Sequence, residues 1–479
     1  MSFVIHKFPV PKAVSLAVHH ELQSLGAEQR RFVLHVLASN ILNLNKIHDH
    51  GLQGYLDLAI ELPFQWIHEH FGREFDATAI DPSVLTLARY STVAHRCRAF
   101  RASDRLLGLM LNGLSGDLAA VVTEPVVNLF DGEPYQVQVP AQWEHGIYSP
   151  KVIRDAVRAI DACPFNLASL ERHLAELKER FEGSSGDDRD HLERVLRNDR
   201  ACALRVLAGC VVQNTGVMTY EPEYRTSYTG RVVEVGGGAQ SCSRAMKAAI
   251  FRNIPDLRNH DLKRAQAFIL LQELEDAGLP RDWVEAYVHD PDANERRSAA
   301  LGISKDVYKK CLYATIMGSP HRKVYDREKN KIFAVMLEEV RGDRRRAKEL
   351  TQDVYGAFRS LKVEVEAWHQ HLMTSPKCLH VDPRWASVRT LKNACGQHFQ
   401  LKDERTDVLA RQAAAFILQG QEAAFIHRLT VLGESYGFVP VNNQHDGLVF
   451  IGSVPQAAIE QAANSSNLRY AFLDEKPFL

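Results

Sequence analysis

The stretch PVNNQHDGLVFIG, residues 440–452, places a histidine, an acid and a glycine between two short apolar runs. Apolar runs on either side of Asp-Gly predict a β-hairpin, because both residues tolerate positive φ in a tight turn. The simplest interpretation is an ordinary surface hairpin. The alternative is that the hairpin carries Asp446 at its tip as a metal-binding carboxylate. Only the rest of the chain distinguishes the two.

The composition is typical of a soluble globular protein. The chain has 479 residues, of which 45% are hydrophobic and 24% charged. That length is enough for roughly two to four domains with hydrophobic cores. No apolar run reaches the length of about 18 residues that a membrane span needs, and the N-terminus lacks the apolar core of a secretory signal. The eight cysteines form no paired framework, so we expect a cytoplasmic protein without a membrane partner.

The charge balance leaves nucleic acid open as a partner. The formal net charge is −1, so basic residues are not in global excess. Phosphates need only a local positive field, however. Lysine and arginine gather in residues 319–348, where acidic residues are interleaved. This segment is interpreted either as a basic groove or as the solvated face of helices.

The N-terminal part of the chain contains several helical segments. Residues 14–72 predict short helices, and the basic stretch 90–101 predicts a small strand pair. This order is typical of a winged-helix nucleic-acid module, but it equally fits a helical cap packed on the main body. Leucines spaced by three and four residues predict a helical hairpin over 165–206, interrupted by GSSGDD at 183–188.

The C-terminal part alternates strand-like pieces with long helices between residues 225 and 440. This alternation predicts an α+β, helix-rich fold with a small antiparallel sheet. The long helices are expected at 261–277, 304–317, 329–373 and 405–436.

Asp261 lies in the segment HDLKRAQAFILLQELEDAGL, directly before an amphipathic run. One interpretation is a helix N-cap, since an Asp there accepts hydrogen bonds from free backbone amides. The functional interpretation is that Asp261 and Asp446 meet in space. They would then hold two divalent metals about 3.5–4 Å apart for an in-line phosphoryl transfer. Hard oxygen ligands favour Mg²⁺, with Mn²⁺ as the alternative ion.

The helix expected within ISKDVYKKCLYATIMGSP, residues 303–320, carries a charged and aromatic stripe. Residues four positions apart lie on one helix face, and here they are Lys305, Lys309, Tyr313 and Met317, followed by Gly318. Two cations and an aromatic ring on one stripe suit a triphosphate followed by a base or sugar. The alternative is a surface helix with its lysines in solvent and Tyr313 half-buried.

Taken in order, these segments resemble the palm and fingers of family A DNA polymerases and of the bacteriophage-type single-subunit RNA polymerases. SYTGRVVEVGGGAQS at 227–241 resembles the Thr-Gly-Arg segment of that family, and HDLKRAQ resembles its first palm motif. LQGQEAAFI at 418–426 resembles the helix before the last motif, and QHDGLVF resembles that last motif. The resemblance covers about residues 225–479 and places the helical hairpin where a thumb belongs.

The resemblance implies a role for each matching residue. Asp261 and Asp446 are the expected metal ligands, and His445, beside the primer end, is the third expected catalytic residue. The expected nucleotide-binding residues are Lys305, Lys309, Tyr313, Met317, Gly318 and Gln266. The expected nucleic-acid-binding residues are Thr229, Arg231, Gln240 and Gln419.

Three positions depart from the family pattern. Met317 stands where the fingers helix normally carries Tyr, and Gly447 stands where a third acid is usual. Gln266 stands where DNA-synthesising relatives carry the Glu that excludes a ribose 2′-hydroxyl. A glutamine of similar bulk favours deoxynucleotides, but its amide is also able to hydrogen-bond a hydroxyl.

We therefore expect a helix-rich right-hand polymerase without an exonuclease domain, similar to compact plasmid- or phage-like members of the family. It would extend a primer 3′-hydroxyl on a DNA template with nucleoside triphosphates, alongside other replication proteins. The alternatives are an RNA polymerase or primase of the same palm, and a non-catalytic DNA-binding replication protein. The expected regions are a mainly helical 1–103, a linker and thumb at 104–220, palm at 221–284, fingers at 285–404 and palm again at 405–479.

Overall fold

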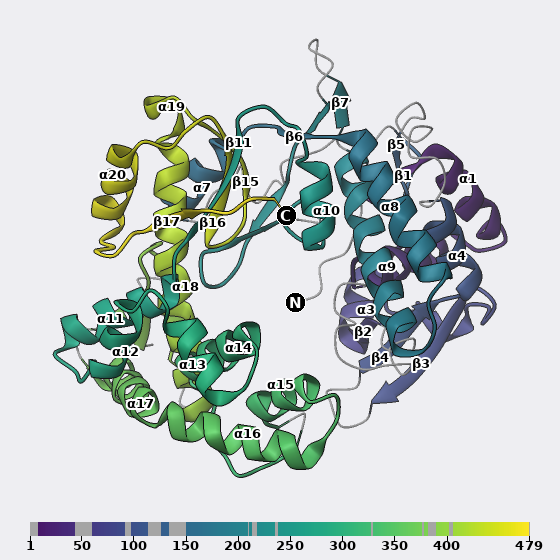
Figure 1. Ribbon diagram of the computed structural model, residues 1–479. Coiled ribbons are helices and arrows are strands. Elements are labelled where there is room, and N and C mark those ends of the chain that lie inside the picture. The colour runs from purple at the N-terminus through teal and green to yellow at the C-terminus, as the bar shows by residue number, and fades with distance from the viewer. Residues whose placement is uncertain are drawn as a thin grey trace.

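The computed structural model describes residues 8–43, 60–91, 97–113, 126–133, 150–208, 210–212, 218–234, 238–326, 329–375, 378–381, 389–401 and 406–478. Within them the fold is helix-rich and carries several small antiparallel sheets, as the α+β prediction requires (Figure 1). No helix in these ranges combines the length and the apolar character that a membrane crossing requires.

A four-stranded antiparallel sheet lies at the centre of the C-terminal part. Its order is β15-β16-β11-β17. Side chains alternate between its two faces: Leu448 and Phe450 pack into the largest core, whereas Val449 packs into a second core on the other face. Both faces are therefore covered by helices. The strands are β15 (Val439–Asn443), β16 (Gly447–Ile451), β11 (Leu257–Leu262) and β17 (Leu473–Glu475).

Two groups of helices cover the sheet. The largest core joins the sheet to α11 (Ala265–Ala277), α18 (Thr406–Val431) and α20 (Gln456–Ser466). The second core joins it to α8 (Leu167–Glu182), α9 (Gly186–Ala208) and α10 (Arg244–Ile250). The helical hairpin predicted over 165–206 is confirmed as α8 and α9.

The predicted helix over 261–277 begins later, and the N-cap interpretation of Asp261 is wrong. Asp261 is a strand residue, because β16 and β17 pair with β11 on either side of it. Helix α11 starts only at Ala265, after Arg264 has turned the chain with a φ of 49°. The Arg264 guanidinium holds that turn by donating to the main-chain oxygens of Tyr287 at 2.8 Å and Asp290 at 2.6 Å.

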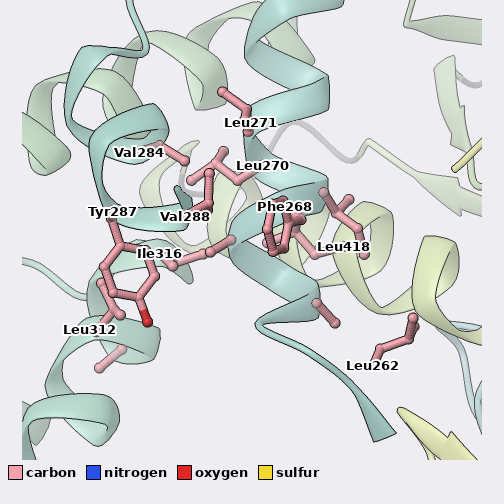
Figure 2. Packing of buried hydrophobic residues seen from close by; sticks show 14 of the residues in the cluster. Leu262, Phe268, Leu270, Leu271, Val284, Tyr287, Val288, Leu312, Ile316 and Leu418 are labelled. Atoms are coloured by element: carbon pink, nitrogen blue, oxygen red, sulfur yellow. The ribbon is translucent and has the colours of Figure 1, made fainter. Parts of the chain in front are cut away.

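Six helices between residues 282 and 374 form an arc beside the sheet (Figure 1). Figure 2 shows how α11 ties this arc to α18: Phe268 and Leu270 lie among side chains of three other helices, such as Val284, Ile316 and Leu418. The helices are α12 (Asp282–Val288), α13 (Ala293–Leu301), α14 (Lys305–Ile316), α15 (Lys331–Glu339), α16 (Arg344–Ala357) and α17 (Arg359–Thr374).

The single helix predicted over 329–373 is therefore wrong, because the chain forms three helices there. Arg341 and Gly342 take φ values of 50° and 90°, which end α15. Asp343 then starts α16, since its carboxylate accepts hydrogen bonds from the main-chain nitrogens of Arg345 and Arg346 at 3.0 Å each. The helix predicted over 405–436 is α18 followed by the short α19 (Gly433–Tyr436).

The N-terminal region has a hydrophobic core of its own. Its three-stranded sheet has the order β2-β4-β3, so β2 adds a strand to the pair predicted near 90–101. Leu106 and Val127 also belong to this core. Its elements are β1 (Pro9–Pro11), α1 (Lys12–Glu21), α2 (Ala27–Asn43), β2 (Ile60–Pro63), α3 (Phe64–Phe71), the 3-10 helix Ala77–Ala79, β3 (Leu85–Ser91), β4 (Cys97–Ala102), α4 (Asp104–Gly113) and β5 (Val126–Asn128).

Smaller sheets join these parts. Strands β6 (Cys163–Phe165), β8 (Met218–Tyr220) and β7 (Cys210–Val212) form one, β9 (Tyr224–Thr226) pairs with β10 (Val232–Glu234), and β12 (Leu379–Val381), β13 (Arg389–Lys392) and β14 (His398–Gln400) form another. Helix α7 (Lys151–Arg158) packs against α18.

Candidate active site

Asp261 and Asp446 lie beside each other at one end of the four-stranded sheet. Asp261 is the register partner of Gly447 in β16, and the main-chain nitrogen of Leu262 donates to the main-chain oxygen of Asp446 at 2.8 Å. Burial, reinforced by the negative charge of Asp446, raises the pKa of Asp261. The fold therefore brings together two carboxylates that repel each other unless a cation lies between them.

Gly447 is required by the close approach of β11. A Cβ atom at this position would collide with the carboxylate of Asp261 and would lie 2.7 Å from the main-chain oxygen of His260. The hairpin prediction is confirmed, but the positive φ expected at Asp-Gly falls instead on His445, at 72°. The main-chain nitrogen of His445 donates to Asn443 Oδ1 at 2.9 Å, which helps to hold this left-handed residue.

Charged residues that the sequence analysis did not identify surround the aspartates. Asp474 of β17 is the register partner of Asp261 on the side away from β16. Its charge adds to the rise in the pKa of Asp261, whereas Lys476 and Lys247 oppose that rise. Lys247, on α10, donates to Gln444 Oε1 in the hairpin loop. Only the strand pairing and the helix packing reveal these neighbours.

Arg231 reaches the site from a tightly anchored turn. The main-chain oxygen of Thr229 accepts from Asn393 at 2.9 Å, and that of Gly230 is hydrogen-bonded to His427 Nε2 at 2.9 Å. Gly230 has a φ of 91°, and a Cβ there would lie 2.8 Å from Cys395 Sγ. The Arg231 guanidinium forms an ion pair with Glu422 of α18, which is 0% exposed.

The charges of Arg231 and Asp446 act on two further titratable groups, Glu422 and His445. Burial raises the pKa of Glu422 to about 7, with Asp446 adding to the rise and Arg231 opposing it. Burial lowers the pKa of His445, and the positive charge of Arg231 lowers it further. The His445 imidazole is therefore neutral at neutral pH.

Helix α14 carries the predicted stripe of Lys305, Lys309, Tyr313 and Met317. Lys305 is exposed, while Lys309, Tyr313 and Met317 are half-buried and the positions between them are mainly buried. The pKa of Tyr313 is raised by burial first and then by the charges of Tyr287, Glu422 and Asp446.

The two lysines of the stripe have different surroundings. Lys305 forms an ion pair with Glu295. Burial and the charge of Lys305 lower the pKa of Lys309, and Lys476 contributes to the same effect. The charge of Lys476 also acts on Asp261, where it opposes the rise in pKa.

The remaining predicted residues lie around this group. Gly318 follows α14 with a φ of 82°, and a Cβ there would lie 2.8 Å from Arg411 Cγ. Gln266, at the start of α11, acts to lower the pKa of the Glu422 carboxyl. Gln419 is half-buried on α18.

Thr229 and Gln240 are both buried. The Gln240 side chain donates to Val232 O at 3.1 Å and Asn443 O at 2.8 Å, and accepts from Glu234 N at 2.8 Å. In this conformation it binds β10 to the hairpin.

The donor chemistry of the two aspartates suits a divalent metal. Among the described residues, no cluster contains three or more side chains able to ligate a metal, so the protein's share would be two carboxylates. That share suits Mg²⁺, which keeps several waters and takes substrate phosphates as further ligands. The electrostatic conflict between Asp261 and Asp446 is what such an ion would relieve.

No protein-family model matches the chain, and no curated protein matches it significantly. Among solved structures, it is similar to the POL domain of Pol1 from M. smegmatis in complex with DNA primer-template and dNTP. The identity is 12% and the TM-score 0.44, over 91% of this chain and 80% of that chain. Similarity at this level leaves fold and function to be argued from the residues of this chain.

Proposed function

We propose that the chain is a template-dependent nucleotidyltransferase, a DNA polymerase that extends a primer 3′-hydroxyl. One observation carries the proposal: Asp261 and Asp446, from distant parts of the chain, lie together at the end of one sheet. Neither caps a helix, and the charge of Asp446 makes ionisation of Asp261 more costly. Such an arrangement favours cation binding over a purely structural role.

The bond changes are those of an in-line displacement. The primer 3′-oxygen forms a bond to the α-phosphorus of the incoming triphosphate, and the bond from that phosphorus to the pyrophosphate oxygen breaks. Metal ions held by Asp261 and Asp446 would acidify the hydroxyl and neutralise charge on the departing pyrophosphate.

In this proposal the substrates are bound and oriented by side chains of α14, of α18 and of the turn before β10. Lys309 and Lys305 contact the triphosphate, for which Lys305 exchanges its partner Glu295. Tyr313 supports the base or sugar. Arg231 and Gln419 contact the minor groove of the duplex, where acceptor positions are shared among base pairs. Neutral His445 lies beside the primer end and adds no positive charge there.

A single-subunit RNA polymerase or primase of the same fold is the second candidate. Gln266 favours it. A carboxamide can accept a hydrogen bond from a ribose 2′-hydroxyl, whereas the Glu that DNA-synthesising relatives carry at this position excludes that hydroxyl.

The test offers dNTPs and rNTPs side by side on primed and unprimed templates to wild type, Asp446→Asn and Asp256→Asn. In Asp446→Asn the rate of metal-dependent incorporation should fall by at least about a hundredfold. Removing one group that stabilises charge in a transition state has an effect of this size. The affinity of the variant for primer-template DNA, measured by fluorescence anisotropy, should stay within about twofold of wild type.

Asp256→Asn is the matched control. Asp256 is exposed near the start of β11 and has a φ of 54°, which Asn also tolerates. This variant should extend primers as wild type does. Undiminished extension by pure Asp446→Asn would refute the proposal. Tight DNA binding by wild type without any incorporation would instead identify a non-catalytic replication protein.

A further inference from the structure

A cavity separate from the two aspartates lies between the end of α14, α17 and the first turns of α18. Its volume is about 800 Å³, and Arg389 of β13 and Leu401 after β14 also line it. Proteins enclose a single small molecule in pockets of about 300–1,000 Å³. Lys305, Lys309 and Tyr313 of the α14 stripe do not line this cavity, and neither do the aspartates. It is therefore a second space of ligand size.

One side of α17 forms a wall of the cavity. The side chains that line it are three or four residues apart, which places them on the same side of the helix. Other residues of α17 are buried in the largest core, so the wall is held firmly. The lining residues of α17 are Lys362, Glu366, His369, Gln370, Met373 and Thr374.

Positive charge predominates in the walls. The cations are Lys362 and the arginines at 322, 389 and 411, and Glu366 is the one carboxylate among the described lining residues. Lys362 forms an ion pair with Glu366 at 3.5 Å. Positive charge gathered in a concave surface concentrates anions there. The cavity is therefore suited to a negatively charged ligand.

Lys362 and Arg389 approach the cavity from different elements, α17 and β13. The Lys362 side chain is only 15% exposed, and its ammonium has three N–H groups. The Arg389 guanidinium donates to the main-chain oxygen of Met373 at 3.2 Å, which uses one of its five N–H groups. A phosphate accepts several charge-assisted hydrogen bonds and so matches this pair of donors.

Two histidines in the walls are uncharged at neutral pH. Burial lowers the pKa of His369 to about 4, and the positive charges of Lys362 and Arg411 act in the same direction. Burial also lowers the pKa of His321 to about 4. The His321 ring is stacked on Tyr355, with centroids 4.4 Å apart and planes 12° apart. The charge for an anion therefore comes from the lysine and the arginines, and the imidazoles add flat, neutral surfaces.

The remaining lining is mostly apolar. Met373, Leu401 and Leu409 line the cavity, and Gln370 adds a carboxamide. A carboxamide both donates and accepts hydrogen bonds, as the edge of a nucleobase does. A ligand that matches the whole lining thus combines a phosphate with a flat ring that has a polar edge. A nucleoside phosphate has this combination.

We propose that the cavity binds a free nucleoside phosphate, at a site separate from the two aspartates. Its phosphate contacts Lys362 and Arg389, and its base lies against Met373 and Leu401. Gly318 also lines the cavity, so the ligand contacts the turn that ends α14. This inference goes beyond the proposed function and does not depend on catalysis.

The experiment titrates ADP into the full chain by isothermal titration calorimetry, with EDTA present so that no divalent metal assists binding at the aspartates. Wild type should bind one ADP with a Kd below about 1 mM. Adenosine lacks the phosphate and inorganic phosphate lacks the base, so each should bind at least about tenfold more weakly than ADP. A short single-stranded oligothymidylate, titrated in the same way, tests a nucleic-acid strand as the occupant.

Lys362→Gln and Arg389→Gln should each raise the Kd for ADP about five- to tenfold, because each removes one charged donor. Lys392→Gln is the matched control for Arg389→Gln, since Lys392 is exposed on the same strand and does not line the cavity. Lys309→Gln tests the α14 stripe as the binding site. Both of these variants should keep the wild-type Kd. If thermal unfolding shows that Lys362→Gln does not fold, Arg389→Gln at its exposed position decides the question.

Four results would overturn the inference. They are a Kd for ADP above about 1 mM in wild type, equal effects of Arg389→Gln and Lys392→Gln, loss of ADP binding in Lys309→Gln, and adenosine or phosphate binding as tight as that of ADP. Binding of the oligothymidylate without binding of ADP would overturn it as well and identify a strand contact. A wild type that binds ADP as expected but extends no primer would overturn the proposed function and leave this inference standing.

Discussion

Gly447 and His445 lie on either side of Asp446 and constrain it in different ways. Gly447 has no side chain because β11 passes too close, with the Asp261 carboxylate where a Cβ would be. His445 has a φ of 72°, a conformation that costs a non-glycine residue about 1 kcal/mol or more. The position of Asp446 thus depends on its neighbours' backbones as much as on its own side chain.

Gly447→Ala should displace Asp261 from Asp446 while leaving most of the fold intact. Because the added methyl meets the carboxylate, we expect a loss of primer extension of at least about a hundredfold. The free energy of unfolding should fall by about 1–3 kcal/mol, as in other overpacked sites. Gly356→Ala is the control, since a Cβ there meets nothing within 4 Å inside α16. Gly356→Ala should retain primer extension, and its free energy of unfolding should rise by about 0.5–1 kcal/mol. Full activity of Gly447→Ala would contradict the proposed geometry.

At the level of elements, one carboxylate joins three helices on the second face of the sheet. Asp199 of α9 is 0% exposed. It accepts hydrogen bonds from the main-chain nitrogen of Ser243 at 2.8 Å and from His173 Nε2 of α8 at 2.9 Å. Ser243 in turn caps α10, the helix that carries Lys247 to the hairpin loop. The α8–α9 hairpin is therefore coupled to the site through α10.

Asp199→Asn should weaken this junction, because an amide cannot accept on both sides as the carboxylate does. Hydrogen bonds to a buried charge contribute about 1.5–3 kcal/mol each. We therefore expect the free energy of unfolding, measured with urea, to fall by about 2–4 kcal/mol. If α8 and α9 hold duplex, primer-template affinity should fall more than nucleotide KM rises. Asp188→Asn, at an exposed position of α9, is the control. Equal stability of the two variants would show that the junction is not what anchors the hairpin.

At the level of the whole molecule, buried titratable groups of opposite sign offset one another. Burial raises the pKa of Glu234 and of Glu422 to about 7, and lowers the pKa of His369 and of His427 to about 4. The two carboxyls bind extra protons in the folded state, so stability falls as pH rises from about 4.5 to about 7. The two imidazoles bind fewer protons in the folded state than in the unfolded state, so their contribution to stability increases as pH rises from about 4 to about 6.5. Between about pH 4.5 and 6.5, the loss of stability from the carboxyls and the gain from the imidazoles therefore largely cancel.

His427→Gln should remove the contribution of one buried imidazole to the pH dependence of stability. His427 is 1% exposed and is hydrogen-bonded to the Gly230 oxygen, a contact that a glutamine amide can replace. As pH falls from about 6.5 to about 4, wild type should lose stability relative to the variant by up to about 1.4 kcal/mol per pH unit. Urea unfolding at a series of pH values measures this difference, and His191→Gln, exposed on α9, controls for the substitution itself. A difference independent of pH would contradict the buried neutral state of His427.

The features that could be predicted from the sequence are local ones. Leucine spacing predicted α8 and α9, the pattern of residues 304–317 predicted α14, and Asp-Gly between apolar runs predicted the β15–β16 hairpin. Each of these signals lies within one segment, where periodicity or turn chemistry acts between near neighbours.

Tertiary structure decided the rest, because it depends on which distant segments pair. Nothing near Asp261 in the chain indicates that β16 and β17 flank it, and its amphipathic surroundings predicted a helix start instead. The ion pair of Arg231 with Glu422 and the junction at Asp199 likewise join residues whose spacing carries no signal. The sequence by itself determined α8, α9, α14, the hairpin and the chemical identity of the candidate ligands. The tertiary structure determined that two aspartates meet, since strand pairing and core packing are interactions between segments.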